Sequence, residues 1–197
     1  LFYLSNKSIS IVGTNGKTST ANYIYKLLCK QDIPSLLFTS PHLVSYQERI
    51  RSNIKEIRYI DYIESIEDFE NRNDIRLGYF ETLFLIACRN FIDLELDVFI
   101  IEAGIGGRLD TTSIINSSGV VLTNVGYDHQ DILGDSLEEI LYEKIHISNN
   151  IKTLVCGEIS DNHKKHISNE LNNISISFNI LLSAKLKFST YCGIVFL

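Results

Sequence analysis

Lys17, Thr18 and Ser19 follow the glycine-bracketed turn Gly13–Gly16, which comes directly after the apolar run Ile9–Val12. Glycine lets backbone N–H groups surround phosphate oxygens, the lysine adds a positive charge, and a hydroxyl can reach a phosphate-bound Mg²⁺. This pattern predicts a strand, a phosphate-binding loop and a helix. The first glycine of the common G-x-x-x-x-G-K-[ST] loop would fall at Ile11, so a tighter loop is expected. The alternative is a strand–turn–helix that binds no ligand.

A second set of polar residues follows the apolar run that ends at Glu102. A carboxylate at the end of a buried strand is costly to desolvate unless it is paired or binds a cation, so Glu102 is a candidate Mg²⁺ ligand. Glycines follow it, with Arg108 and Asp110 as polar arms. A tight turn closed by an Arg108–Asp110 ion pair is the alternative.

Other candidate groups have weaker support from the residues alone. Ser40, held out of helical conformation by Pro41, offers a hydroxyl, and His129 offers a metal-binding imidazole, although a loop histidine is usually solvated. Segment 48–51 is either a surface strand or part of a substrate wall. Lys144, next to Glu143, has the pattern of a surface lysine.

These residues must be positioned by the elements between them. Apolar runs alternate with helical patterns, which predicts an α/β fold with an open, mostly parallel sheet and helices on both faces. The expected strands are Ser8–Val12, Ser35–Phe38, Asp97–Glu102, Gly119–Asn124, Thr153–Cys156 and Ser175–Phe178. The expected helices are Thr18–Lys30, Ile60–Glu70, Tyr79–Phe91, Leu137–Ser148 and Asp161–Leu171.

Polar clusters follow the ends of the first strands along the chain. In open α/β sheets, ligands bind outside the carboxyl ends of the strands. We therefore expect one rim to gather the loops Gly13–Ser19, Thr39–His42, Glu102–Asp110 and Asn124–His129.

The composition excludes several classes of protein. The 197 residues are 45% hydrophobic, enough for one sizeable core, and the net charge of −6 argues against nucleic-acid or membrane-surface binding. No apolar run is long enough to cross a bilayer. The 4 cysteines form no C-x-x-C pair, which favours a reducing cytoplasm over a disulfide framework or a zinc site.

Taken together, the motifs resemble those of the folylpolyglutamate synthase/dihydrofolate synthase family, the folate branch of the Mur ligase-like ATP-dependent amide ligases. The resemblance runs from about Ile9 to Lys144 and weakly to Phe178. It rests on Gly-Thr-Asn-Gly-Lys at 13–17, Thr-Ser-Pro-His-Leu at 39–43, Glu-Arg-Ile at 48–50, Tyr-Phe-Glu-Thr at 79–82, Glu-Ala-Gly-Ile-Gly-Gly-Arg-Leu-Asp at 102–110 and Asp-His-x-x-x-Leu-Gly at 128–134.

The resemblance implies ATP and Mg²⁺ as cofactors and assigns roles to individual residues. Lys144 matches a lysine that the family carbamylates, which would bring an anion to a second Mg²⁺. It and Lys17 are the implied catalytic residues. ATP phosphates would be held by Asn15, Gly16, Lys17, Thr18 and Ser19, and Mg²⁺ by Ser40, Glu102 and His129. The pterin–benzoate substrate would be bordered by Gly78, Tyr79, Phe80, Glu81, Leu109, Asp110 and Thr111.

The implied reaction is ATP-dependent addition of L-glutamate to dihydropteroate or folates through an acyl phosphate, by a cytoplasmic monomer that binds neither nucleic acid nor a membrane. Thr18, where folate ligases usually carry glycine, favours a Mur-type ligase of peptidoglycan precursors as an alternative. Residues 145–149 also depart from the family pattern after Lys144.

The resemblance also implies how the chain is divided. Residues 1–180 correspond to the ATP-binding central domain, trimmed at its N-terminus, and 181–197 to an irregular tail. The family's C-terminal ligase domain has no counterpart here. We therefore expect the chain alone to be weak or inactive in ligation, and a non-catalytic nucleotide-binding fragment is the third interpretation.

Overall fold

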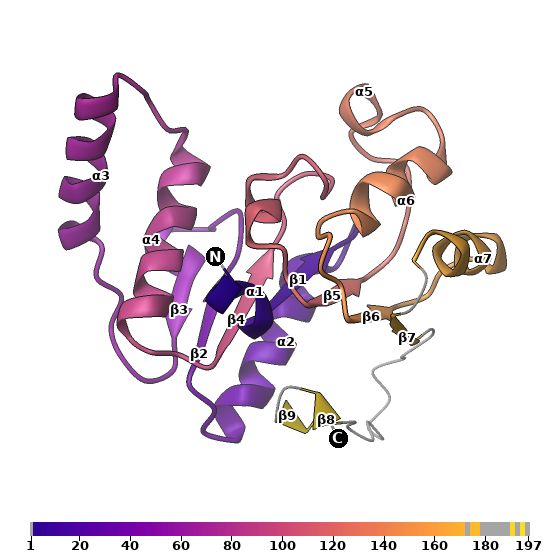
Figure 1. Cartoon of the computed structure of the whole chain (residues 1–197), viewed down its shortest axis with the longest axis horizontal. Coiled ribbons are helices and arrows are strands. Elements are labelled where there is room, and N and C mark those ends of the chain that lie inside the picture. Colours follow the sequence, from indigo (N-terminus) through magenta and orange to yellow (C-terminus); the bar gives the residue numbers. More distant parts are fainter. Residues whose placement is uncertain (1, 172–173, 178–189, 192–193, 196–197) are drawn as a thin grey trace.

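A computed structural model describes residues 2–171, 174–177, 190–191 and 194–195. Seven strands form one sheet in the order β3-β2-β4-β1-β5-β6-β7 (Figure 1). These strands are β1 (Ser8–Val12), β2 (Ser35–Phe38), β3 (Ile50–Ser52), β4 (Val98–Glu102), β5 (Gly119–Leu122), β6 (Thr153–Cys156) and β7 (Ser175–Ser177). The α-helices are α1 (Phe2–Lys7), α2 (Lys17–Lys30), α3 (Ile60–Asn73), α4 (Tyr79–Asp93), α5 (Gln130–Leu133), α6 (Leu137–Ile145) and α7 (Asp161–Glu170).

The strand pairing confirms a mostly parallel sheet. Every neighbouring pair in it is parallel except β2 and β3, which are antiparallel. The central strands are buried on both faces, which explains why β4 reads Val-Phe-Ile-Ile-Glu as one continuous run rather than an alternation.

Helices cover both faces of the sheet, as expected. On one face, α4 and α1 pack over β2 and β4 through a core that includes Phe84, Phe91 and Phe99. On the same face, α6 and α7 pack over β5 and β6. The other face is covered by α2, whose Ala21 and Leu28 contact β1, β2 and β4. Figure 1 shows α3 and α4 at the β3 end of the sheet and α6 and α7 at the other.

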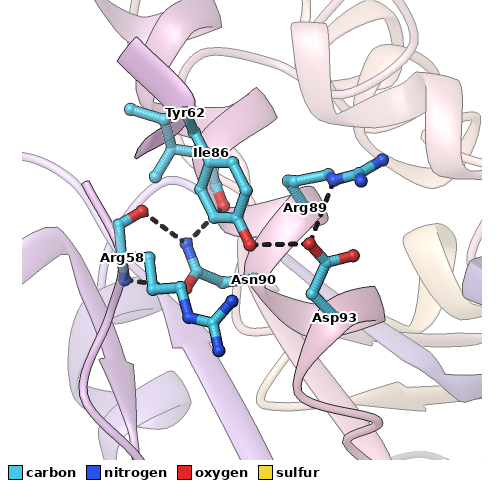
Figure 2. Close-up of polar contacts among 6 residues, drawn as sticks. All are labelled: Arg58, Tyr62, Ile86, Arg89, Asn90 and Asp93. Carbon is cyan, nitrogen blue, oxygen red and sulfur yellow. Dashed lines mark hydrogen bonds and ion pairs between the residues drawn. The ribbon is translucent and has the colours of Figure 1, made fainter. Parts of the chain in front are cut away.

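A buried polar network joins the segment before α3 to α4 (Figure 2). Asn90 is fully buried, and its amide accepts from Arg58 N–H at 2.9 Å and donates to the carbonyls of Arg58 at 3.2 Å and Ile86 at 2.9 Å. Tyr62 on α3 donates to Asp93 at 2.7 Å. Because a buried amide is costly unless its hydrogen bonds are made, these contacts fix how the segment and α3 dock on α4.

Every helix and strand expected from the sequence is present; β1, β2 and β6 have the expected bounds, and the other elements have shifted ends. Helix α6 ends at Ile145 rather than Ser148, and β5 ends at Leu122 rather than Asn124. The sequence did not indicate α1, α5, the 3₁₀ helices η1 (Tyr46–Arg49) and η2 (Thr111–Ile115), or the strands β8 (Thr190–Tyr191) and β9 (Ile194–Val195). These pieces are too short for a periodic pattern, and α1 depends on burial of Leu4. Phe178 and most of the expected tail 181–197 lie outside the described residues.

No described helix is both long and apolar enough to span a membrane.

Candidate functional site

The predicted phosphate loop ends at Gly16, which precedes the first residue of α2. Gly16 has φ 77°, a left-handed conformation that glycine adopts without strain, and no side chain caps the helix. The first-turn amides of α2 therefore point outward unsatisfied, at the positive end of the helix dipole. Lys17 Nζ folds back to donate to the carbonyls of Gly13 at 3.0 Å and Thr14 at 3.3 Å. This geometry fits an anionic phosphate.

The loop that follows β5 holds the phosphate loop in place. Asn124 accepts from Asn15 N–H through Oδ1 at 2.9 Å and from Thr14 N–H through its carbonyl at 3.2 Å. Thr123 Oγ1 donates to the carbonyl of Asn15 at 2.6 Å. These bonds lock two of the expected strand-end loops together.

Glu102 links two more loops at the end of β4. It is 1% exposed; its Oε1 accepts from Thr18 Oγ1 at 2.6 Å and its Oε2 from Ser40 N–H at 3.0 Å. Burial raises the pKa of the Glu102 carboxyl above its ordinary value, against the opposing effects of these two hydrogen bonds and of the Lys17 charge. A carboxylate held here without a full counter-charge suits a bound cation.

A cavity of about 460 Å³ opens over these groups. The predicted loops after β1, β2 and β4 all contribute to it, as does the N-terminus of α4. Its lining consists of Thr14, Asn15, Gly16, Lys17, Thr18, Ser40, Pro41, Arg49, Phe80, Glu102, Gly104 and Ile105. The structure therefore brings Asn15, Gly16, Lys17, Thr18, Ser40, Glu102 and Phe80 together; Ser19 lies in the first turn of α2 without lining the cavity.

The expected alternative of an Arg108–Asp110 ion pair is wrong. Arg108 pairs with Glu143 of α6 at 2.8 Å. Asp110 Oδ2 accepts from the N–H groups of Gly104 at 2.9 Å and Ile105 at 3.0 Å, while Oδ1 caps η2. Asp110 thus shapes the glycine loop that lines the cavity, and its carboxylate is fully used in doing so.

Lys144 is not the surface lysine that its neighbours suggested. It is 2% exposed. The loop after β4 reaches it closely, since a Cβ on Gly107 would lie 2.5 Å from the carbonyl of Glu143 and 2.9 Å from that of Lys144. Burial, followed by the Lys17 charge, lowers the pKa of the Lys144 amine to about 8, while Asp128 opposes this. A buried amine with a pKa lowered to about 8 has a much larger neutral, nucleophilic fraction than an exposed lysine.

The burial of Lys144 predicts how the stability of the chain depends on pH. An amine whose pKa falls from 10.5 to about 8 on folding binds fewer protons in the folded chain between those values, so stability rises with pH from 8 to 10.5. We expect Lys144→Met to raise the melting temperature at pH 7 and the gain to shrink toward pH 10.5, as followed by thermal unfolding. The exposed Lys165→Met is the control and should change little. A lower melting temperature for Lys144→Met at pH 7 would contradict this account.

His129 is positioned differently from the other expected Mg²⁺ ligands. It precedes α5 with φ 48°, its Nε2 lies 3.6 Å from Asp128 Oδ1, and it is absent from the cavity lining. No cluster of three or more His, Cys, Asp or Glu side chains suited to a metal occurs among the described residues. Its role as a ligand stays a prediction.

The expected substrate border divides into residues with different surroundings. Phe80 lines the cavity and packs edge-on against Phe38, with ring centroids 5.4 Å apart. Glu81 instead caps α4, accepting from Gly78 N–H at 2.6 Å. Tyr79 and Leu109 are exposed, and Thr111 begins η2. Of this group, only Phe80 lines the cavity.

The oxygen atoms and backbone amides gathered here fit Mg²⁺ and a nucleoside triphosphate. Mg²⁺ takes few protein oxygens and completes its shell with phosphate oxygens and water. Here one buried carboxylate, Glu102, lies beside the hydroxyl of Thr18 and next to the uncapped start of α2. The backbone N–H of Ser40 also donates to Glu102, so Ser40 lies next to the same carboxylate.

The sheet, the glycine-bracketed turn before α2 and the buried carboxylate define the fold as a P-loop-like α/β domain. The sequence profile of the Mur ligase middle domain matches residues 11–189. The chain therefore belongs to the Mur ligase middle-domain family.

The relatives point to one branch of this family. The chain is 39% identical over 150 residues to a dihydrofolate synthase/folylpolyglutamate synthase of Buchnera aphidicola, covering 76% of this chain and 36% of that protein. It is 38% identical over 150 residues to the protein of the same name from Escherichia coli, with the same coverage of each. The chain thus spans about a third of the length of these relatives.

Solved structures agree with the sequence relatives. An FPGS–AMPPCP–folate complex superposes with a TM-score of 0.80 at 28% identity, covering 88% of this chain and 45% of that one. Escherichia coli FolC in complex with DHPP and ADP superposes with a TM-score of 0.77 at 30% identity, covering 96% of this chain and 46% of the other.

Several residues that line the cavity were not predicted individually from the sequence. Arg49, Gly104 and Ile105 line it, yet none was a specific candidate, although segment 48–51 was considered as a substrate wall. Arg49 lies in a short 3₁₀ helix without a periodic pattern. The positive charge of Arg49, close in sequence to the Ser-Pro-His turn, was the feature that could have indicated a role in the cavity.

Proposed function

We propose that this chain is the ATP-binding part of a ligase that joins L-glutamate to dihydropteroate, to folates or to both. The observation that carries the proposal is Glu102, held between Thr18 of the phosphate loop and Ser40 of the Ser-Pro-His turn. The names of the relatives and the folate and DHPP complexes of the structural neighbours support the folate branch.

In this proposal, the first-turn amides of α2 and the Lys17 ammonium hold and neutralise the phosphates. Mg²⁺, held by Glu102 with Ser40 and His129, would offset phosphate charge and polarise the phosphoryl group under attack. The reaction class is attack of the acceptor carboxylate on the γ-phosphorus, which releases ADP and gives an acyl phosphate. The amine of glutamate would then attack the acyl carbon, form the amide and release phosphate. This chain positions the reactants and supplies charge.

Carbamylation of Lys144 is part of the proposal. The neutral form of an amine attacks CO₂, and the lowered pKa of Lys144 makes that form available near neutral pH. The product is an anion beside Lys17, with which the unmodified Lys144 ammonium interacts unfavourably. A carbamate at this position could support a second Mg²⁺, as an ammonium could not.

The remaining assignments are proposals of the same kind. They comprise an ATP-binding domain over residues 1–180 followed by the tail 181–197, a monomeric state, and a cytoplasmic location, with which the free thiols Cys29, Cys88 and Cys156 agree. A Mur-type peptidoglycan precursor ligase is the second candidate, favoured by Thr18, whose hydroxyl contacts Glu102.

Phosphate release from ATP tests the proposal. The chain is incubated with ATP, Mg²⁺ and L-glutamate, together with either dihydropteroate or a UDP-muramoyl precursor. We expect slow phosphate release above the ATP-only background in the mixture that contains dihydropteroate, and none above it in the mixture that contains the UDP-muramoyl precursor. Release with only the UDP-muramoyl precursor would assign the chain to peptidoglycan synthesis. ATP·Mg²⁺ binding without release in either mixture would favour a non-catalytic module.

A further inference from the structure

Arg49 lies on a rigid support at the rim of the cavity. It ends η1, immediately before β3, and its carbonyl accepts from Thr39 N–H at 2.8 Å. The neighbouring Glu48 accepts from the N–H groups of Leu43, Val44 and Ser45 at 2.8 to 2.9 Å. The turn that carries Arg49 is therefore fixed at both of its ends.

The guanidinium of Arg49 is oriented but has no anionic partner. Its Nε donates to His42 Nδ1 at 2.9 Å, and its Cζ lies 5.3 Å from the ring centroid of Tyr79. Within the described part of the chain, no carboxylate forms an ion pair with Arg49, whereas Arg89 and Arg108 each have one. The terminal nitrogens are thus available to a planar anion, for which a guanidinium is well suited.

The strand order places Arg49 away from the phosphate loop. Across the rim, the order β1-β4-β2-β3 places Lys17 first, then Glu102, then Ser40, and Arg49 last. Neighbouring strands are about 4.8 Å apart, so the starts of α2 and β3 are separated by roughly three such spacings. Arg49 is therefore at the end of the cavity opposite the loop that would hold ATP.

Apolar groups line the same cavity. Phe80 and Ile105 line the same cavity as Arg49, and Phe80 is only 3.5 Å from where a Cβ on Gly104 would be. The cavity therefore combines an aromatic side chain with a guanidinium that pairs with no carboxylate among the described residues. It fits an aromatic acid better than a second phosphate.

We propose that Arg49 binds the carboxylate of the acceptor and presents it to the phosphate end of the cavity. This inference rests on the proposed function, since it assumes a pterin–benzoate acceptor. A carboxylate that approaches a triphosphate meets like charge, and a bidentate guanidinium offsets that repulsion while fixing the carboxylate plane. His42 and Tyr79 position Arg49 for this contact.

Binding of an acid and its matched amide tests the inference. Pteroate and pteroamide are titrated into the 197-residue chain in the presence of Mg²⁺ and a non-hydrolysable ATP analogue. We expect the wild-type chain to bind pteroate more tightly than pteroamide by about tenfold or more, the range of a charge-assisted hydrogen bond. In Arg49→Gln this preference should disappear, with pteroamide affinity nearly unchanged; Arg49→Lys should keep part of it.

Arg51→Gln is the matched control. Arg51 is two residues away, and its guanidinium contacts Asn22 and lies over Tyr25 rather than lining the cavity. It should keep the wild-type preference for the acid, and thermal unfolding confirms that each variant is folded.

The outcomes separate this inference from the proposed function. A folded Arg49→Gln chain that still prefers pteroate as strongly as the wild type would overturn the role of Arg49 and leave the function standing. Weaker binding of the ATP analogue with an unchanged acid preference would also overturn it, because Arg49 would then serve the nucleotide. A wild-type chain that binds neither pteroate nor pteroamide would contradict the function itself.

Discussion

Replacing Glu102 with glutamine will make the unliganded chain more stable and will abolish most of the gain in ATP affinity that Mg²⁺ provides. Glutamine keeps the shape and can still accept from Ser40 N–H, but it removes the buried charge. Loss of a buried charge partner costs roughly 3 kcal/mol or more, which corresponds to about a hundredfold in affinity. Calorimetric titration of a non-hydrolysable ATP analogue with and without Mg²⁺ measures this loss.

The stability gain has a defined dependence on pH. A carboxyl whose pKa is raised on folding binds more protons in the folded chain, so its ionisation lowers stability as pH rises from its ordinary value of 4.5 through the folded value. Glu102→Gln should therefore melt higher than the wild type at pH 7 and equally at pH below about 4. The exposed Glu67→Gln is the control. A lower melting temperature at pH 7, or an undiminished effect of Mg²⁺, would rule out this role for Glu102.

Replacing Lys17 with alanine will weaken binding of the ATP analogue by about a hundredfold. In the unliganded chain, its ammonium contacts only the carbonyls of Gly13 and Thr14 among the described residues. It is therefore free to move to phosphate oxygens, where a charge-assisted contact is worth up to about 3 kcal/mol. Ligation by an intact enzyme with this change should be abolished.

Lys26→Ala provides the matched control for Lys17. Lys26 is an exposed lysine on the same helix, so its removal changes the net charge equally without touching the loop. It should retain wild-type affinity for the ATP analogue. Equal affinities for Lys17→Ala and the wild type would show that the loop does not bind phosphate.

The fold and half of the site were predictable because they depend on local patterns. Segments rich in apolar residues identified β1, β2 and β4, and the carboxyl ends of parallel strands must share an edge of the sheet. The meeting of Lys17, Ser40 and Glu102 followed from that rule alone. The contact between Thr18 and Glu102 needed the strand order, which places β4 beside β1.

The rest of the site depends on tertiary contacts that carry no local signal. The sequence around Lys144 is typical of a surface residue. In the structure, Gly107 lets the loop after β4 lie close to the backbone of Lys144, and Lys144 is buried. The sequence suggests that Asp110 contacts the substrate. In the structure, both of its carboxylate oxygens instead accept hydrogen bonds from backbone N–H groups of the same loop. Arg49 became a candidate only when the structure showed that no carboxylate pairs with it among the described residues.

In the proposed function, residues around Glu102 form a Mg²⁺·ATP site that serves a folate-type acceptor. The most direct test is a calorimetric titration of dihydropteroate into the chain, with and without Mg²⁺ and a non-hydrolysable ATP analogue. We predict one binding site whose affinity increases when the nucleotide and Mg²⁺ are present, and no binding of a UDP-muramoyl precursor under the same conditions. Binding of the UDP-muramoyl precursor in place of dihydropteroate would contradict the account.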